Sequence, residues 1–294
     1  MEKDPEMNSD IVLIALDDDS KIASGYEYIW PYKYLSETVK KITDGDPNSF
    51  GMDYIFSGST DTIGWSRFVD ELAVSYMAVN PYTVEFGSIK DPFEINLHNS
   101  EIADELTMDN LRQIGPIEGK HVTNIRYKTN SALMEVSSGL GFVNMVRDLD
   151  GVVRRLPIVA EINGMLAPHF SLKLLCEHLG YKISNIELES QHKLILHKFP
   201  VGDTVKTLEM PLDGDGNVLI NYPSFKKIQY QMKSGQFTSI SAWNLIQHRK
   251  APNFKGKTVI FGDHSLAARD NSITPMDGSL FNPLIFTIVM SNIL

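Results

Sequence analysis

Three aspartates lie in or after short apolar runs, where carboxylates are well placed to bind a ligand. Asp17 directly follows one apolar run, Asp53 lies within a second, and Asp270 stands in the segment after a third. Ligands of open α/β sheets bind outside the carboxyl ends of the strands, so Asp17 and Asp270 can converge although they are far apart in the sequence. The alternative is structural, because such carboxylates also cap helices or fix loops by accepting backbone N–H groups. The residues alone leave both interpretations open.

Two further acidic segments resemble parts of calcium-binding loops, in which oxygen ligands alternate along the chain. They are residues 213–217, with the sequence Asp-Gly-Asp-Gly-Asn, and residues 148–151, with the sequence Asp-Leu-Asp-Gly. The first lacks the glutamate that such a loop needs further along the chain, and Asp-Gly pairs are typical of tight turns. We therefore predict a turn at both places and no metal site.

Motifs of cofactor-dependent enzymes are missing from the sequence. Gly139-Leu140-Gly141 lacks the third glycine of a dinucleotide-binding loop, and there is neither a Walker-type phosphate loop nor a His-Glu-x-x-His zinc signature. The eight histidines do not have the spacing of metal ligands. We expect no cofactor and no enzymatic activity of the chain by itself. Two alternatives stay open: a metal-assisted hydrolase that uses Asp17, Asp53 and Asp270, and a dimerisation module without a ligand.

The composition is that of a folded protein that does not bind nucleic acid. Of the 294 residues, 43% are hydrophobic and 22% are charged, which provides enough apolar surface for a core. The formal net charge is −10, whereas nucleic-acid binding depends on clustered Lys and Arg. The one cysteine, Cys176, lies in an apolar helical pattern and is expected to be a buried structural thiol.

Strand-like and helical patterns alternate along the chain, which predicts an α/β fold. Short β-branched runs indicate buried strands, and apolar residues at helical spacing indicate the helices between them. The alternation favours a central, mostly parallel sheet that is covered by helices. Strands are expected at residues 10–16, 50–56, 74–79 and 257–262, and helices at 31–42, 65–74, 168–180 and 239–248, the last with Ser241 as the candidate N-cap.

The middle of the chain follows this alternation less closely. Residues 82–129 have mixed charges and little periodicity, and we expect irregular structure there with one short helix at 102–113. Residues 141–145 and 152–160 are predicted to form two strands joined by the turn at 148–151.

A hairpin-rich β excursion is predicted at residues 182–222, where short alternating runs are separated by Asp-Gly pairs. No internal repeat or linker divides the chain. We therefore expect one domain that comprises residues 1–294, with residues 1–9 as a flexible lead.

The last segment of the sequence, residues 281–294, is almost entirely apolar. Pro283 is well placed to open a helix that runs to Leu294, and apolar side chains occupy more than half of its circumference. We expect this helix to dock on the sheet or on a second subunit and to lead into the membrane in the intact protein. No apolar run reaches the ~18 residues that a membrane span needs, and residues 1–10 are polar and acidic, unlike a secretory signal.

Several segments, taken in order, resemble the type-two CHASE domain (CHASE2), the cyclase and histidine-kinase associated sensory extracellular family. Their order and spacing carry the resemblance, which covers the chain from about residue 10 to residue 294. The segments are residues 10–20, Trp30-Pro31-Tyr32, residues 50–56, Gly139-Leu140-Gly141-Phe142-Val143-Asn144 leading to Asp148-x-Asp150-Gly151-x-x-Arg154-Arg155-x-Pro157, residues 255–262, and Asp270-x-x-x-Thr274-Pro275.

The resemblance implies a ligand-sensing domain in the periplasmic portion of a bacterial inner-membrane protein. It further implies adjacent membrane helices and a cytoplasmic output such as a nucleotide cyclase, a histidine kinase or a Ser/Thr kinase. The signal is an unknown small molecule or protein, and the intact receptor is expected to be a homodimer. The candidate ligand-binding residues are Asp17, Asp53, Arg154, Asp270 and Thr274.

Arg154 or Arg155 is also expected to be partly buried and bonded to a carboxylate or a backbone carbonyl, and Arg154 is the better candidate because it shares a face with Val152. It follows Val152 and Val153 in an apolar strand-like run. An arginine in such a run needs partners for its N–H donors.

Overall fold

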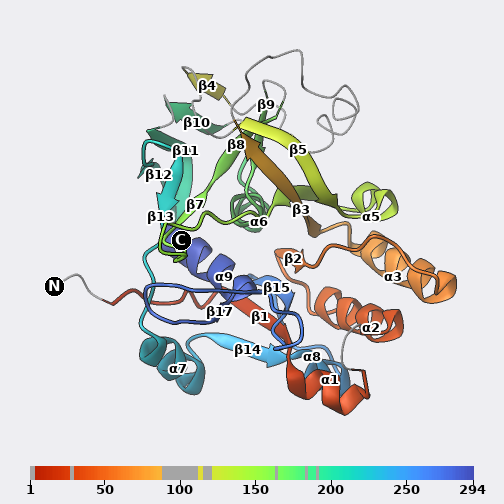
Figure 1. Cartoon of the computed structure of the whole chain (residues 1–294). Coiled ribbons are helices and arrows are strands. Elements are labelled where there is room, and N and C mark those ends of the chain that lie inside the picture. Colours follow the sequence, from red (N-terminus) through yellow and green to blue (C-terminus); the bar gives the residue numbers. More distant parts are fainter. Residues whose placement is uncertain are drawn as a thin grey trace.

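The computed structural model describes residues 4–26, 30–87, 112–114, 121–162, 165–182, 185–189 and 192–294. In this part of the chain, a large and mostly parallel sheet carries helices on both faces, and a smaller antiparallel sheet stands beside it (Figure 1). The predicted fold class is confirmed.

The parallel part of the large sheet has the strand order β14-β1-β15-β2-β3, and β6 pairs with β3. Its central strands β1 and β15 are buried throughout, as their unbroken apolar runs predict. Along β1 the side chains alternate, so that Ile11 and Leu13 join one core cluster and Val12 and Ile14 join the other. The strands are β1 (Ile11–Leu16), β2 (Ser49–Asp53), β3 (Ala78–Gly87), β6 (Gly139–Phe142), β14 (Thr238–Ser241) and β15 (Thr258–Asp263).

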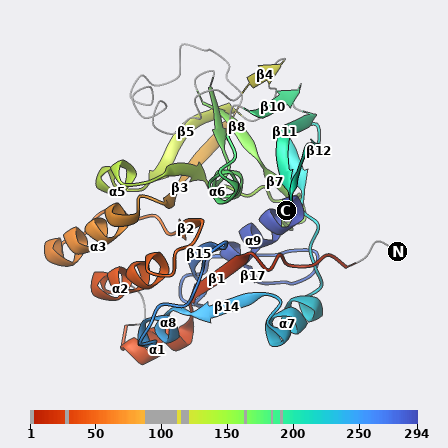
Figure 2. The same cartoon turned by 180° about the vertical axis from the view of Figure 1, so that it is seen from behind.

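Helices cover the two faces of this sheet. Helices α2, α3, α5 and α8 contribute to the second core cluster, and α6, α7 and α9 contribute to the first, an arrangement that Figure 2 shows from behind. Glycine at position 51 lets α6 approach β2, because a Cβ there would lie 2.6 Å from the Phe170 ring. The helices are α1 (Asp18–Ser24), α2 (Tyr32–Thr43), α3 (Thr62–Ser75), α5 (Ser131–Glu135), α6 (Phe170–Leu179), α7 (Phe225–Ser234), α8 (Ala242–Gln247) and α9 (Asn282–Ile293).

The other strands are mostly antiparallel. The large sheet continues from β3 through β5 (His121–Lys128) and β8 (Val159–Ile162) to β9 (Met165–Pro168). The predicted hairpin-rich section, residues 182–222, supplies most of the second sheet, in the order β12-β11-β10-β4. These and the short strand pairs are β4 (Arg112–Ile114), β10 (Ile186–Glu189), β11 (Lys193–Val201), β12 (Thr204–Pro211), β7 (Arg155–Pro157) with β13 (Asn217–Leu219), and β16 (Asn271–Ser272) with β17 (Leu280–Phe281).

The prediction of irregular structure for residues 82–129 is wrong at both ends of this segment. Strand β3 continues to Gly87, and β5 pairs with it antiparallel. Strand β5 keeps one buried position, Val122, and exposes most of the rest, so its alternating pattern is too weak to detect. Most of the short helix predicted at 102–113 lies outside the described residues, and its end falls in strand β4.

Two other local predictions are corrected. The strand predicted at 74–79 begins only at Ala78, because α3 extends to Ser75. The turn at 148–151 is present, but the strands beside it pair elsewhere: β6 joins β3, and β7 joins β13. Strands that are distant in the sequence pair with β6 and β7 over more residues than these two segments pair with each other.

The C-terminal helix α9 packs on β1, β15 and α6. All its residues from Pro283 to Met290 are buried, which confirms that the apolar segment is a covered helix. Near the other terminus, Met7 is buried, and its N–H donates to Gln231 Oε1 (2.9 Å), so the described part of the expected lead has a defined place beside α7. Among the described residues, no helix is long and apolar enough to cross a membrane.

Candidate functional site

The parallel strands β1, β15 and β2 end at one edge of the sheet, which we call the carboxyl edge. Leu16 pairs with Asp263, and Gly262 pairs with Asp53, so the last residues of three neighbouring strands lie side by side. Asp53 therefore ends its strand, whereas the sequence places it inside a longer one. This register brings acidic side chains from distant parts of the chain to the position where α/β proteins bind ligands.

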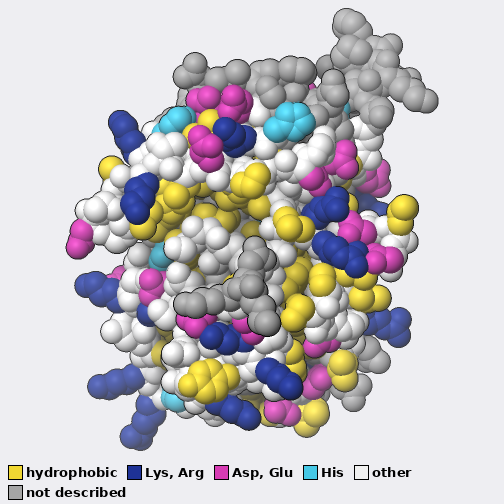
Figure 3. Space-filling view, turned by 90° about the vertical axis from the view of Figure 1, so that its left-hand side faces the viewer, with side chains coloured by type: hydrophobic (Ala, Val, Ile, Leu, Met, Phe, Trp, Pro, Cys, Tyr) yellow, Lys and Arg dark blue, Asp and Glu magenta, His cyan; other side chains and the backbone are white. Residues whose placement is uncertain are grey.

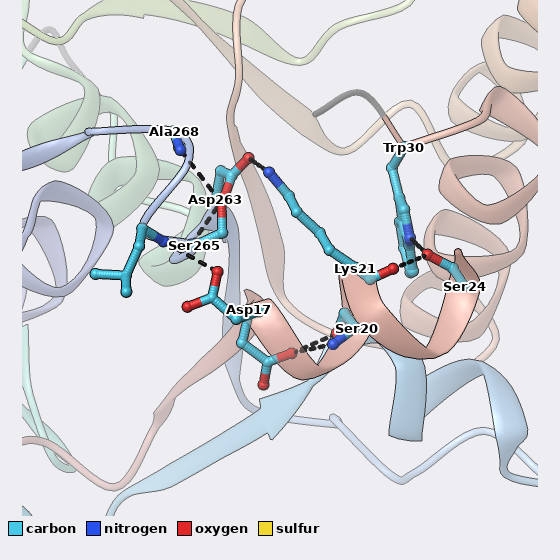
Figure 4. A network of polar contacts seen from close by, with 10 residues as sticks. Asp17, Ser20, Lys21, Ser24, Trp30, Asp263, Ser265 and Ala268 are labelled. Atoms are coloured by element: carbon cyan, nitrogen blue, oxygen red, sulfur yellow. Dashed lines mark hydrogen bonds and ion pairs between the residues drawn. The ribbon is translucent and has the colours of Figure 1, made fainter. Parts of the chain in front are cut away.

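Asp17 caps helix α1. Its Oδ1 accepts hydrogen bonds from the N–H of Ser20 (2.8 Å), from the Ser20 hydroxyl (2.5 Å) and from the Ser241 hydroxyl (3.0 Å) (Figure 4). Ser241 precedes α8, as predicted, but its hydroxyl binds Asp17 and does not cap that helix. The sequence leaves open whether Asp17 binds a ligand or caps a helix. Its contacts in the structure are those of a helix cap.

A buried ion pair joins α1 to the end of β15. Lys21 Nζ lies 2.8 Å from Asp263 Oδ2, and the two side chains are only 4% and 9% exposed. The other carboxylate oxygen of Asp263 accepts hydrogen bonds from the N–H and the hydroxyl of Ser265 (2.9 and 2.6 Å; Figure 4). Sequence reasoning missed this pair. The signal was an acidic residue directly after the last buried strand, the same signal that singled out Asp17.

Asp53 and Asp270 form a different kind of contact, because they are two carboxylates without an opposite charge. Burial, and then the negative charge of Asp270, raise the pKa of Asp53 well above its usual range. Burial also raises the pKa of Asp270, with a hydrogen bond from Asn282 acting against it and the charge of Asp263 adding to it. Asp53 is partly exposed to solvent. Its Oδ2 atom, however, is buried and has no hydrogen-bond partner among the described residues.

This pair can bind a group that supplies positive charge or N–H donors. Within the described part of the chain, no lysine or arginine forms an ion pair with either Asp53 or Asp270. Carboxylates with such raised pKa values in a partly open position are typical of functional sites. The structure thus brings together two of the five predicted site residues.

Helix α9 starts at this pair. The side-chain amide of Asn282 donates to Asp270 Oδ1 (2.6 Å), and its backbone N–H donates to the Asp270 carbonyl (3.1 Å). Close packing fixes the same end of the helix, since a Cβ at Gly262 would lie 2.4 Å from Pro283 Cγ. A change at Asp270 therefore acts directly on the first turn of α9.

Arg154 and Thr274 lie in another region. Arg154 is half-buried and bonds Asp148 (2.8 Å) and both carboxylate oxygens of Asp150 (2.9 and 2.8 Å), in a segment that we call the acidic turn, residues 148–154. This confirms the prediction of a satisfied arginine. Thr274 bonds the backbone of Asp277 in a loop whose Ile273 carbonyl accepts from the N–H of Val153.

The segments that resemble calcium loops are turns, as predicted. In residues 213–217, Asp213 accepts hydrogen bonds from the backbone of Asp215 and Asn217. Gly151 and Gly216 have φ values of 81° and 77°, which a side chain would disfavour.

The described residues contain no group of three or more His, Cys, Asp or Glu side chains arranged to hold a metal ion. Asp17, Asp53 and Asp270 therefore do not form the carboxylate cluster that the hydrolase alternative requires.

Buried His169, partly buried His264 and the cysteine have pKa values that burial shifts. Burial lowers the pKa of His169 to about 3 and that of His264 to about 4. His169 caps α6 through Nδ1, and His264 stacks on Phe281. Cys176 is buried, as predicted, and burial raises the pKa of its thiol to about 12.

A cavity of about 580 Å³ lies away from the carboxyl edge, between β12, β13 and the end of α9. Hydrophobic side chains gather on this side of the molecule (Figure 3). The two carboxylates that line it, Glu6 and Glu209, are paired with Lys227 and Lys193. We regard the carboxyl edge as the better candidate site, because the Oδ2 atom of Asp53 has no hydrogen-bond partner among the described residues.

The family model described as CHASE2 domain matches residues 1–294, the whole length of the chain. This confirms the resemblance inferred from the motifs. Neither a curated protein nor a solved structure gives a match.

Proposed function

The chain belongs to the CHASE2 domain family, whose members are sensory extracellular domains of receptors, and from this we propose that it is the ligand-sensing part of a bacterial membrane receptor. In this proposal the domain lies in the periplasm, membrane helices adjoin it, and the cytoplasmic output is a nucleotide cyclase, a histidine kinase or a Ser/Thr kinase. The intact receptor is a homodimer. The observation that carries the proposal is the family match over the whole chain.

We further propose that the ligand binds at the carboxyl edge, where it contacts Asp53 and Asp270. The support is the buried, unpartnered Oδ2 of Asp53 beside a second carboxylate. Asp17, Arg154 and Thr274 then hold the surrounding segments, since their side-chain hydrogen bonds within the described residues all go to the protein itself. A ligand that neutralises the pair relieves the repulsion between Asp53 and Asp270, and it favours the conformation in which they are closest.

The proposed route to the output is helix α9. Asn282 links Asp270 to the first turn of this helix through two hydrogen bonds. The Ser272 hydroxyl donates a further hydrogen bond to Oδ1 of Asn282 (2.8 Å). Packed helices switch between discrete arrangements, so a small change at Asp270 can be converted into a shift of α9.

The periplasmic location is tested by labelling of an introduced cysteine. Val74→Cys places a thiol on α3 at a position that is 83% exposed, whereas the native Cys176 is buried and gives little background. In cells that express the intact receptor, we expect a membrane-impermeant maleimide to label this variant without lysis. Labelling that requires lysis of the inner membrane would refute the proposed location.

The signalling route is tested by Asn282→Ala in the intact receptor. We expect the basal activity of the output domain in isolated membranes to change at least twofold, because α9 loses its side-chain hydrogen bond to Asp270 and keeps only the backbone one. Asn253→Ala removes a hydrogen bond from an exposed loop and serves as the matched control. Equal output from both variants, at equal receptor abundance, would contradict the route.

A further inference from the structure

A small cavity of about 160 Å³ opens beside the carboxyl edge, on the face that carries α1 and α2. Its wall contains the rings of Trp30, Tyr32, Tyr54 and Phe56, together with Leu16 at the end of β1. Its volume is below the ~300 Å³ at which pockets for drug-sized molecules begin, so its ligand is small.

Contacts with the protein hold the rings of this aromatic pocket in place. Trp30 is 2% exposed, and its Nε1 donates to the Ser24 hydroxyl (2.8 Å; Figure 4). The Tyr32 hydroxyl donates to the Gly58 carbonyl (3.3 Å), and Tyr54 stacks on Phe56 with ring centroids 4.6 Å apart. A ligand therefore meets rings that are already positioned, which lowers the entropy cost of binding.

Two carboxylates lie near the tyrosines of the aromatic pocket. After burial, the main cause that raises the pKa of Tyr54 is the carboxylate of Asp263. Asp61 acts in the same direction on Tyr32, after burial and against a hydrogen bond from Ser59. Asp263 is paired with Lys21, whereas Asp61 forms no ion pair within the described residues.

We propose that the aromatic pocket binds a small organic cation of the ammonium class, with its positive charge against the ring faces. This inference rests on the proposed sensing function, and it adds a site to the one proposed at Asp53 and Asp270, because neither of these residues lines the pocket. Aromatic faces attract cations, and more strongly where water is excluded. The carboxylate of Asp61 repels an anion, and a neutral molecule gains nothing from it.

The test compares choline with 3,3-dimethylbutan-1-ol, a neutral molecule in which carbon replaces the charged nitrogen. Binding to the whole chain is measured by calorimetry and by tryptophan fluorescence, with sodium chloride added to match the ionic strength. We expect choline to bind at least tenfold more tightly than the neutral molecule. Equal affinity for the two, or binding of neither, would overturn the proposal.

Variants of Tyr54 locate the site. Tyr54→Leu removes the ring and is expected to weaken choline binding about tenfold, whereas Tyr54→Phe keeps the ring and the affinity. Tyr230→Leu is the matched control, because Tyr230 lies on α7 and is 63% exposed. Choline binding that is the same in Tyr54→Leu and Tyr230→Leu, with both variants folded by melting temperature, would place the cation elsewhere and refute the inference.

The choline experiments test the ligand class separately from the proposed sensing function. If choline binds the chain in this pattern but leaves the output of the intact receptor unchanged, the pocket stands and its role in sensing fails. If no cation binds while the labelling and Asn282→Ala experiments succeed, the sensor stands and the ligand class proposed for it is wrong.

Discussion

The carboxyl edge and the acidic turn contain the same side chain in opposite surroundings. In the acidic turn, two hydrogen bonds from Arg154 hold the pKa of Asp150 at about 2, and a further bond from Arg154 reaches Asp148. At the carboxyl edge, burial and the charge of Asp270 raise the pKa of Asp53. Arg154 neutralises the aspartates of the acidic turn, whereas no lysine or arginine of the described residues forms an ion pair with Asp53 or Asp270.

The difference separates a structural role from a binding role. The carboxylates of the acidic turn have their partner and stabilise a loop, so they have little free energy left for a ligand. Asp53 and Asp270 destabilise the folded protein while they are charged, and a positively charged ligand would relieve this. Proteins commonly keep such unfavourable groups only at functional sites.

The largest effect is expected where the carboxyl edge does hold an opposite charge. Lys21→Met keeps most of the side-chain volume but leaves Asp263 buried without its partner, which should lower the free energy of unfolding by about 3–5 kcal/mol. Denaturant unfolding measures the change. Lys40→Met is the control, because Lys40 is 55% exposed in its ion pair with Asp44. Similar losses in the two variants would show that burial of the Lys21 pair has no special energetic consequence.

The second effect has the opposite sign. Asp53→Asn removes a charge that is buried beside Asp270, so we expect the free energy of unfolding at neutral pH to rise by about 1–2 kcal/mol. The same substitution at Asp150 should lower stability, because it removes the partner of Arg154. If both substitutions change stability in the same direction, the comparison between the two regions fails.

The Asp53→Asn substitution is expected to raise the free energy of unfolding by removing a charge. The pH dependence of this rise tests whether charge is its cause. A carboxyl whose pKa is raised in the folded state is penalised only where it is ionised, so the penalty disappears as the pH falls through the folded-state pKa toward the ordinary value of 3.8. The stability difference between Asp53→Asn and the unmodified chain should be largest at neutral pH and absent below about pH 4. Unfolding measured at a series of pH values decides this, and a constant difference would point to packing instead of charge.

The smallest effect is expected at Arg154. Its ion pairs lie in a partly exposed turn, where such contacts contribute little, so Arg154→Ala should lower the melting temperature by only about 1–2 °C. Choline affinity should not change, since the acidic turn is not part of the aromatic pocket. A loss of choline binding in this variant would show that the two regions are coupled.

Local sequence patterns predicted most of the elements near the site. Unbroken apolar runs identified β1 and β15, and helical spacing identified α2, α6 and α9. Asp-Gly pairs identified the turns at 148–151 and 213–217. Strand β5 was missed, because a strand that exposes most of its residues has too few buried positions for a pattern.

The candidate site was predicted in part. The position in or after an apolar run singled out Asp17, Asp53 and Asp270, and the last two do lie together. Asp263 also directly follows such a run but was not singled out, and its partner Lys21 lies 242 residues away in the chain. No local pattern identifies such a partner.

By itself, the sequence determined which segments form strands and helices, and it determined the family, because both depend on the order and spacing of residues along the chain. Only the tertiary structure decided that β15 lies between β1 and β2, which sets the neighbours of every acidic residue at the carboxyl edge. The physical reason is that strand pairing joins residues regardless of their separation in the chain. The ionisation of a carboxylate then depends on burial and on the charges within a few ångströms, so Asp53 and Asp150 differ in pKa although they are the same residue type.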